Sequence, residues 1–245
     1  MGILMSYKLP EKAAEFCLLQ RTSLIHDNRS KLTKRLSRIG LGKTYEETVK
    51  EQSKVDNLDI EKGYYKTVRE SFERIKSHIP NHTKSILDIG SGIAGLNIYL
   101  WQLLKKNNPQ IYLLDKTRSE KKIWYSFSTN GAFYNSLQLA KKNLILNGIP
   151  SNKINLIEAP ANGAIKNLKN IDLIISTISW GYHYPVDLYI DSVFSIMSKN
   201  GTLILDVRKN MGGLETLASK FKHISIIKED SNSFTVKCCK KNIAS

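Results

Sequence analysis

Cysteine and long apolar runs are scarce in this chain of 245 residues. Its three cysteines, Cys17 and the adjacent Cys238 and Cys239, form neither a zinc-ligand spacing nor an even-numbered disulfide framework. No stretch approaches the roughly 20 apolar residues that a membrane-spanning helix needs, and the N-terminus lacks the basic and apolar segments of a secretory signal. These absences predict a reduced, cytoplasmic protein without a membrane span or a metal site.

Positive charge is in excess, with a formal net charge of +15. A basic surface attracts phosphates, so a nucleic-acid partner has to be considered. The charge is spread along the chain, and 29 of the 37 basic residues are lysine, whereas base recognition relies on the bidentate guanidinium of arginine. A small-molecule partner is therefore favoured and nucleic acid is the less favoured alternative, while the oligomeric state is left open.

Residues 81–245 alternate between strand-like and helix-like segments, as a mostly parallel sheet covered on both faces requires. Strands are predicted at 85–89, 110–114, 154–158, 171–177 and 202–206, and helices at 96–106, 134–147, 186–198 and 213–222. Two further apolar runs, 223–227 and 233–239, flank a polar turn and predict a hairpin. The predicted fold is α/β: a seven-stranded, mostly parallel, doubly wound sheet with an antiparallel C-terminal hairpin.

Residues 1–80 have a helical pattern, so we expect a helical N-terminal extension or cap on a core formed by 81–245. Within it, residues 31–39 place apolar side chains on one stripe and basic ones around it. That basic face is either solvated surface or a phosphate-binding surface. A longer helix over 60–79 leads into the first strand, and its Tyr64 and Tyr65 either reach the ligand pocket or pack in the interior.

Three glycines follow the first predicted strand in the sequence Asp88-Ile-Gly90-Ser-Gly92-Ile-Ala-Gly95. The G-x-G-x-x-G spacing allows a tight turn and close approach of a ligand to the backbone at a helix N-terminus. The second strand ends twenty residues later at Asp115, where a carboxylate accepts hydrogen bonds from a ribose diol. Dinucleotide fingerprints usually carry an apolar residue at the position of Asp88, whereas an acid there suits a ligand with an ammonium group.

The sequences D-I-G-S-G-I-A-G and L-L-D resemble motifs I and II of the class I S-adenosylmethionine-dependent methyltransferases, with a nicotinamide or flavin enzyme as the alternative. The resemblance implies S-adenosyl-L-methionine as cofactor. Asp88, Gly90, Gly92 and Gly95 are then expected around its methionine part, and Asp115 at its ribose. Ala161 and Asn162 are expected near adenine, unless Asn162 only caps the next helix, and Thr177 is also assigned to the cofactor site.

The acceptor face is predicted after the fourth strand, at Trp180-Gly-Tyr182-His183-Tyr184. The [N/D/S]-P-P-[Y/F/W] signature of nucleic-acid amino-group methyltransferases is absent there. His183 is the candidate catalytic base for a hydroxyl acceptor, or else a structural histidine. Tyr182, Tyr184 and Trp180 are predicted substrate walls, although Trp180 can equally belong to the core. Arg208, after the fifth strand, is a candidate substrate contact or an ion-pair partner of Asp206.

A long aromatic segment, residues 116–134, separates the second strand from its helix and is interpreted as a lid, a substrate wall or a surface excursion. Residues 133–148 and 205–209 are also similar to sugar methyltransferases. Together these features predict transfer of a methyl group from S-adenosylmethionine to a hydroxyl of a small polar metabolite or sugar. The alternatives are an RNA methyltransferase with a lysine-rich surface, and a cofactor-binding module without transfer activity.

Overall fold

The computed structural model describes residues 7–10, 12–26, 30, 45–55, 57–119 and 134–240. The basic segment predicted at 31–39 lies outside these residues. Residues 120–133 of the segment interpreted as a lid, which include its tryptophan and phenylalanines, also lie outside the described residues. None of the helices in the described part of the chain is both long enough and apolar enough to cross a bilayer.

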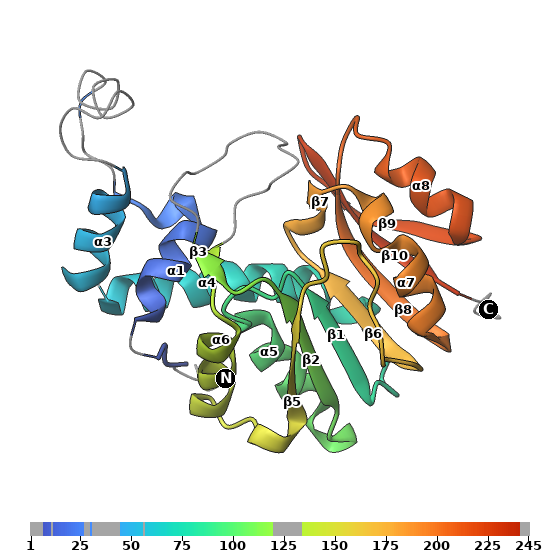
Figure 1. Cartoon of the computed structure of the whole chain (residues 1–245), viewed down its shortest axis with the longest axis horizontal. Coiled ribbons are helices and arrows are strands. Elements are labelled where there is room, and N and C mark those ends of the chain that lie inside the picture. The colour runs from blue at the N-terminus through green and yellow to red at the C-terminus, as the bar shows by residue number, and fades with distance from the viewer. Residues whose placement is uncertain are drawn as a thin grey trace.

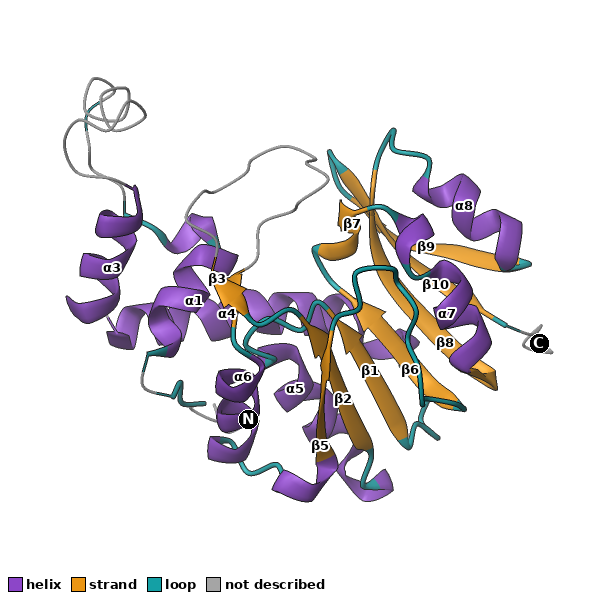
Figure 2. Cartoon of the chain, in the orientation of Figure 1, coloured by secondary structure: helices purple, strands orange, loops and turns teal. Residues whose placement is uncertain are grey.

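Seven strands form one sheet in the order β5-β2-β1-β6-β8-β10-β9 (Figures 1 and 2). They are β1 (Ser85–Ile89), β2 (Gln110–Asp115), β5 (Ile154–Glu158), β6 (Ile171–Ser176), β8 (Met197–Arg208), β9 (His223–Glu229) and β10 (Ser233–Cys239). The first five in spatial order run parallel, and β10 is antiparallel to both β8 and β9. The predicted sheet and its C-terminal hairpin are confirmed.

Helices cover both faces of the sheet, as a parallel sheet requires. One face carries α4 (Asn57–Ile75), α5 (Gly95–Leu104) and α6 (Leu137–Leu146), and the other carries α7 (Ile190–Ile196) and α8 (Gly213–Lys220). Because strand side chains alternate, Ile86 of β1 packs toward the first group and Leu87 toward the second. Short 3₁₀ turns are η1 (Thr22–Leu24), η2 (Lys76–His78), η3 (Lys105–Asn107), η4 (Ser151–Lys153) and η5 (Val186–Leu188).

The N-terminal helices share the core of the sheet. Buried Cys17 and Leu18 of α1 (Ala13–Gln20) belong to the same apolar cluster as Tyr64 of α4 and Leu96 of α5. Helix α3 (Tyr45–Val55) packs beside α1 and α4. The division of the chain at residue 80 stays a prediction, but these helices contribute to the packing around β1.

Two helix limits differ from the prediction for local reasons. Helix α6 begins at Leu137 because the Ser136 hydroxyl caps it by accepting the backbone N–H of Leu139 at 3.3 Å. The residues before this cap form β4 (Tyr134–Asn135), which pairs with β3 (Arg118–Ser119). Helix α7 ends at Ile196, and β8 begins at the next residue and pairs with β6.

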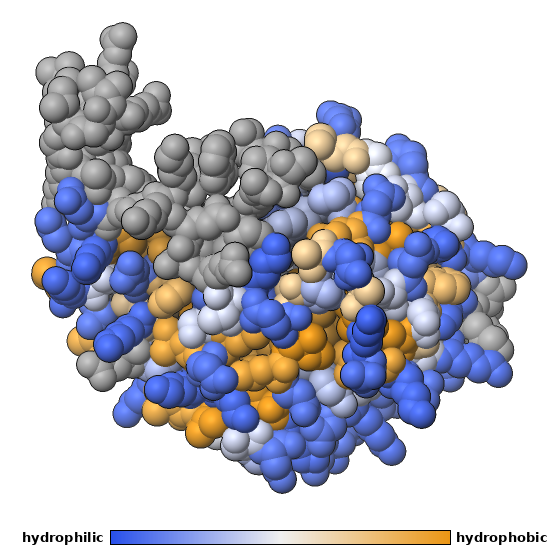
Figure 3. All heavy atoms as spheres, in the orientation of Figure 1, coloured by the Kyte–Doolittle hydropathy of each residue, from blue (hydrophilic) through white to orange (hydrophobic). Residues whose placement is uncertain are grey.

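The connection from β5 to β6, residues 159–170, contains no helix. Tyr112 of β2 and Ile157 of β5 are consequently only half-buried on this face of the sheet. Figure 3 shows apolar side chains gathered across the middle of the molecule in this view, with hydrophilic margins. The carboxyl ends of the parallel strands lie beside this connection, where open α/β sheets bind ligands.

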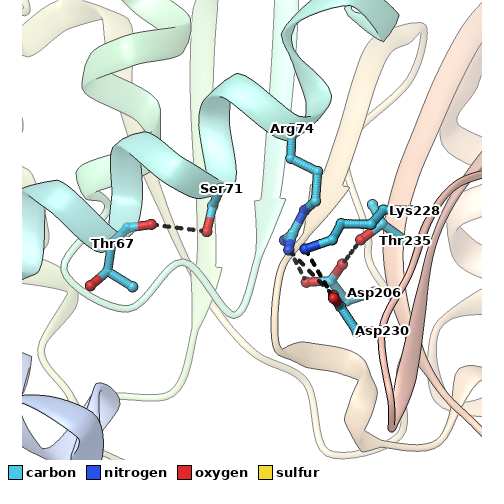
Figure 4. Close-up of polar contacts among 7 residues, drawn as sticks. All are labelled: Thr67, Ser71, Arg74, Asp206, Lys228, Asp230 and Thr235. Carbon is cyan, nitrogen blue, oxygen red and sulfur yellow. Dashed lines mark hydrogen bonds and ion pairs between the residues drawn. The ribbon is translucent and has the colours of Figure 1, made fainter.

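An ionic cluster ties α4 to the C-terminal strands (Figure 4). Arg74 lies 3.3 Å from the Asp206 carboxylate of β8, whose other oxygen accepts the Thr235 hydroxyl of β10 at 2.6 Å. Arg74 also lies 4.0 Å from Asp230, which pairs with Lys228 at 2.9 Å. Asp206, considered in the sequence as an ion-pair partner of Arg208, therefore anchors α4 to the sheet.

Candidate functional site

A tight turn joins β1 to α5 and brings other elements against its backbone. Gly90 and Gly92 have φ of 72° and 55°, values that favour glycine. A Cβ on Gly90 would lie 1.9 Å from the Ser179 hydroxyl oxygen, and one on Gly92 would lie 2.5 Å from the Gln20 side-chain oxygen. Ser179 leaves no room for a side chain at Gly90, while at Gly92 the end of the flexible Gln20 side chain would have to move and the positive φ would remain unfavourable.

Most backbone N–H groups of this glycine turn, residues 90–95, already have acceptors within the protein. The pairs are Gly90 to the Leu114 carbonyl (2.7 Å), Gly92 to Asp115 (2.8 Å), Ile93 to Gln20 (3.3 Å), Ala94 to the Ser91 carbonyl (2.8 Å) and Gly95 to the Tyr64 hydroxyl (3.2 Å). A dinucleotide pyrophosphate needs such donors at the helix N-terminus to be free. The turn is therefore poorly suited to a pyrophosphate, and this argues against a nicotinamide or flavin dinucleotide.

Asp115 lies at the carboxyl end of β2 and lines a cavity beside the turn. Its carboxylate accepts the backbone N–H groups of Gly92 at 2.8 Å and of Lys116 at 2.7 Å. Burial raises the pKa of Asp115 to about 6, although these N–H groups and the side chain of Asn135 act to lower it. A partly satisfied carboxylate at this edge retains lone pairs for a diol.

Asp88 is the other acid of the motif, and its side chain is 4% exposed. It accepts a hydrogen bond from the Asn97 amide of α5 at 2.5 Å, on the face of β1 that carries α5. Burial raises the pKa of Asp88 to about 7, the Asn97 hydrogen bond acts to lower it, and the charge of Asp115 raises it further. Asp88 does not line the cavity, whereas Asp115 does.

The cavity has a volume of about 390 Å³ and lies at the carboxyl ends of β1, β2 and β5. It is lined by Ile89, Gly90, Leu114, Asp115, Lys116, Ala159, Pro160, Ala161, Ser179, Trp180, Tyr184, Pro185, Leu188 and Tyr189. Most of this wall is apolar or aromatic, and the Asp115 carboxylate lies beside it. Such a lining suits a flat, mostly apolar ring joined to a polyhydroxylated group.

Only some of the residues predicted around adenine and after the fourth strand line the cavity. Ala161 lines the cavity, whereas Asn162 is exposed and its side-chain oxygen accepts the backbone N–H of Ala164 at 3.2 Å. Thr177 is half-buried between β6 and the following strand and is not part of the cavity wall. Because no helix follows Asn162 in this connection, its side chain caps none, and the bond to Ala164 closes a local turn.

The segment after β6 forms a further strand, β7 (Ser179–Tyr184), that the sequence analysis did not predict. Its entry is strained, because Ile178 has φ of 56°, which is unfavourable for a β-branched residue. The Ser176 hydroxyl holds this turn by donating to the Ile89 carbonyl at 2.7 Å and accepting the Trp180 backbone N–H at 3.0 Å. The buried Trp180 indole donates to the Val186 carbonyl at 3.0 Å, so this side chain is part of the core as well as of the cavity wall.

The polar residues of β7 form a second group at this edge. The rings of Tyr182 and His183 are 5.1 Å apart and nearly perpendicular, and the Arg208 guanidinium carbon lies 5.5 Å from the Tyr182 ring centre. The His183 side chain is exposed to solvent. Partial desolvation and the charges of Arg208 and Arg21 lower the pKa of His183 below its usual 6.5. An imidazole of this kind is neutral and able to accept a proton at neutral pH.

Several site residues carry no recognisable signal in the sequence. Gln20 and Tyr64 contact the glycine turn from the N-terminal helices, and Ser179 and Tyr189 face Gly90 and the cavity. They lie far from motif I along the chain, and only Tyr64 stood out as a candidate. Within the described residues, no group of three or more His, Cys, Asp and Glu side chains is gathered as a metal site requires.

No protein-family model matches the sequence, and no curated protein matches it. Among solved structures, a predicted O-methyltransferase from Nostoc punctiforme PCC 73102 matches with a TM-score of 0.51 and 14% identity, over 72% of this chain and 56% of that chain. A SAM-dependent methyltransferase from Aquifex aeolicus matches with a TM-score of 0.50 and 10% identity, over 72% of this chain and 98% of that chain. At these identities the likeness concerns the fold alone.

The sheet order, the glycine turn and the acid that ends β2 together define a Rossmann-like fold with a cavity at the carboxyl edge of its sheet. The particular fold is that of the class I S-adenosylmethionine-dependent methyltransferases, which confirms the resemblance seen in the sequence.

Proposed function

We propose that this chain is an S-adenosylmethionine-dependent methyltransferase that acts on a hydroxyl of a small polar metabolite or sugar. The observation that carries the proposal is the glycine turn whose N–H groups are largely occupied, next to an apolar cavity with Asp115 at its edge. These features favour a nucleoside without phosphates over a dinucleotide.

The residues present fit the cofactor. Asp115 retains lone pairs for two ribose hydroxyls, and the apolar wall around Ala161 and Tyr189 suits an adenine ring. Gly90 lines the cavity without a side chain, so the amino-acid part could approach the backbone there, and the buried Asp88 lies two residues before it. When bound, S-adenosylmethionine supplies a methyl group already activated on a sulfonium.

His183 is the proposed base for the acceptor hydroxyl. With a pKa below 6.5 it is unprotonated at pH 7, so it can take the proton that a hydroxyl loses as its oxygen forms the new bond. Tyr182 and Tyr184 would hold the acceptor from the sides, while Trp180 would do so as part of a rigid wall. Arg208, which lies over the Tyr182 ring, is the proposed polar contact to the acceptor.

The affinity for the product S-adenosylhomocysteine is expected to rise with pH between about 5 and 7. Ribose hydroxyls donate to the ionised carboxylate, and the pKa of Asp115 is raised to about 6, so its ionised form is lost as pH falls through 6. Binding at pH 5 should be about tenfold weaker than at pH 7, because about one tenth of the carboxylate is ionised one unit below its pKa. Calorimetric titrations at several pH values measure this.

Asp115→Asn should weaken binding and remove most of this pH dependence, while Asp59→Asn, on the exposed surface of α4, should change neither. If Asp115→Asn keeps the full dependence, the titrating group is not Asp115, and Asp88 becomes the next candidate because its pKa is raised to about 7.

The proposed function is tested by incubating the purified protein with methyl-labelled S-adenosylmethionine and fractionated cell extract. Label in small molecules supports the proposal. Label in RNA would instead favour an RNA methyltransferase, whose binding should fall steeply with salt because phosphate contacts release counterions. Tight cofactor binding with no transfer to any fraction would favour a binding module.

A further inference from the structure

The N-terminal helices contact the glycine turn directly. Gln20, the last residue of α1, accepts the backbone N–H of Ile93, and its side chain occupies the space that a Cβ on Gly92 would need. Tyr64 of α4 accepts the backbone N–H of Gly95, and a Cβ on Gly95 would lie 2.8 Å from its ring. The side of the turn away from β1 is therefore built by residues that precede the sheet in the chain.

Arg21 follows Gln20 and leaves the helix, with φ of −132° and ψ of 76°, while its backbone N–H still donates to the Cys17 carbonyl at 2.9 Å. The Nε atom of Arg21 is buried and has no hydrogen-bond partner. The hydroxyl oxygen of Ser91, inside the turn, is likewise buried without a partner. Buried polar groups are nearly always paired in folded proteins, so the Arg21 Nε donor and the Ser91 hydroxyl are available to a ligand.

The charge of Arg21 acts on groups in both parts of the site. Burial raises the pKa of Tyr64 well above its usual range, and the positive charge of Arg21 acts to lower it. The same charge contributes to the lowered pKa of His183, after desolvation and Arg208. The guanidinium is therefore within electrostatic reach of both the glycine turn, through Tyr64, and the acceptor strand β7, through His183.

An anion bound at this end of the site needs hydrogen-bond donors other than the backbone N–H groups of the turn. The backbone N–H groups of Gly92, Ile93 and Gly95 are already bonded to protein acceptors. A guanidinium offers a planar fork of N–H donors that matches a carboxylate. The proposed cofactor carries one carboxylate, on its amino-acid part.

We propose that Arg21, assisted by the Ser91 hydroxyl, binds the carboxylate of the cofactor's amino-acid part, so that the N-terminal segment completes the cofactor site. The proposal rests on the proposed function, because it assumes a nucleoside linked to an amino acid. Its position would make Arg21 a cofactor-binding residue supplied from outside motifs I and II.

The test compares two ligands that differ in the amino-acid part, S-adenosylhomocysteine and 5′-methylthioadenosine, by calorimetry on the full-length protein. Arg21→Gln is expected to weaken S-adenosylhomocysteine binding by about 10- to 100-fold, the usual range for a charge-assisted hydrogen bond, and to leave 5′-methylthioadenosine binding unchanged. Arg69→Gln removes the same charge from an exposed position on α4 and should affect neither ligand. Equal weakening of both ligands would overturn the proposal, because it would show a general distortion of the site.

Unchanged binding of both ligands by Arg21→Gln would also overturn it. A raised KM for the acceptor in that variant would then assign Arg21 to an anionic group of the acceptor. Arg21→Lys and Ser91→Ala provide milder changes if Arg21→Gln fails to fold, and each should weaken only S-adenosylhomocysteine. If the parent protein binds 5′-methylthioadenosine but not S-adenosylhomocysteine, the carboxylate contact is refuted. If it binds neither, the proposed function fails together with this inference.

Discussion

His183→Ala is expected to lower kcat for a hydroxyl acceptor by about 10²- to 10⁴-fold, the usual contribution of a general base. His183 does not line the cavity proposed for the cofactor, so binding of S-adenosylhomocysteine should stay within about twofold of the parent. In the parent, kcat/KM should fall as pH drops below 6.5, because desolvation and two arginines lower the pKa of His183 and protonation removes the base.

His223→Ala provides the matched control, because His223 is an exposed histidine on β9. It should leave kcat and the pH profile unchanged. Full turnover by His183→Ala, with the same fall of kcat/KM at low pH as in the parent, would show that another group takes the proton and that His183 is structural.

Arg74→Met is expected to lower the free energy of unfolding by about 3 kcal/mol, the lower end of the range for breaking a buried ion pair. The reason is that Asp206, with a side chain 5% exposed, would keep only the Thr235 hydroxyl as a partner (Figure 4). Lys62→Met removes a lysine from an exposed pair on α4 and should change stability by less than about 0.5 kcal/mol. Urea denaturation of the three proteins gives the comparison.

Adding Asp206→Asn to Arg74→Met should recover part of the loss, because a neutral amide is less costly to bury than an unpaired carboxylate. No recovery in the double variant, or a loss as small as that of Lys62→Met, would mean that the cluster does not hold α4 to the sheet. The ionic cluster lies on the face of the sheet that carries α4. The affinity of each variant for S-adenosylhomocysteine shows whether the proposed cofactor site is still intact.

The sheet and the turn after its first strand were predictable because their signals are local. Two patterns occur within about thirty residues: a strand followed by an acid and glycines, and a second strand that ends in Asp115. Each pattern predicts a turn beside a ligand. The alternation of strands and helices in residues 81–245 predicted a mostly parallel sheet, and the polar turn before Ser233 predicted the hairpin.

The rest of the site depends on contacts that bring distant segments together. Gln20 and Tyr64 meet the turn only after α1 and α4 pack on α5, and nothing near either residue in the sequence marks that contact. Strand β7 escaped prediction because Gly181 and a left-handed Ile178 interrupt its pattern, while tertiary bonds from Ser176 hold it. Local propensity does not contain such contacts.

The proposed function requires that a nucleoside with an amino-acid tail, rather than a dinucleotide, occupies the site beside the glycine turn. Calorimetric titration of the folded protein with S-adenosylhomocysteine and, separately, with NAD tests this most directly. We expect saturable binding of S-adenosylhomocysteine that Asp115→Asn weakens, and no measurable binding of NAD. Tight binding of NAD with none of S-adenosylhomocysteine would contradict the account.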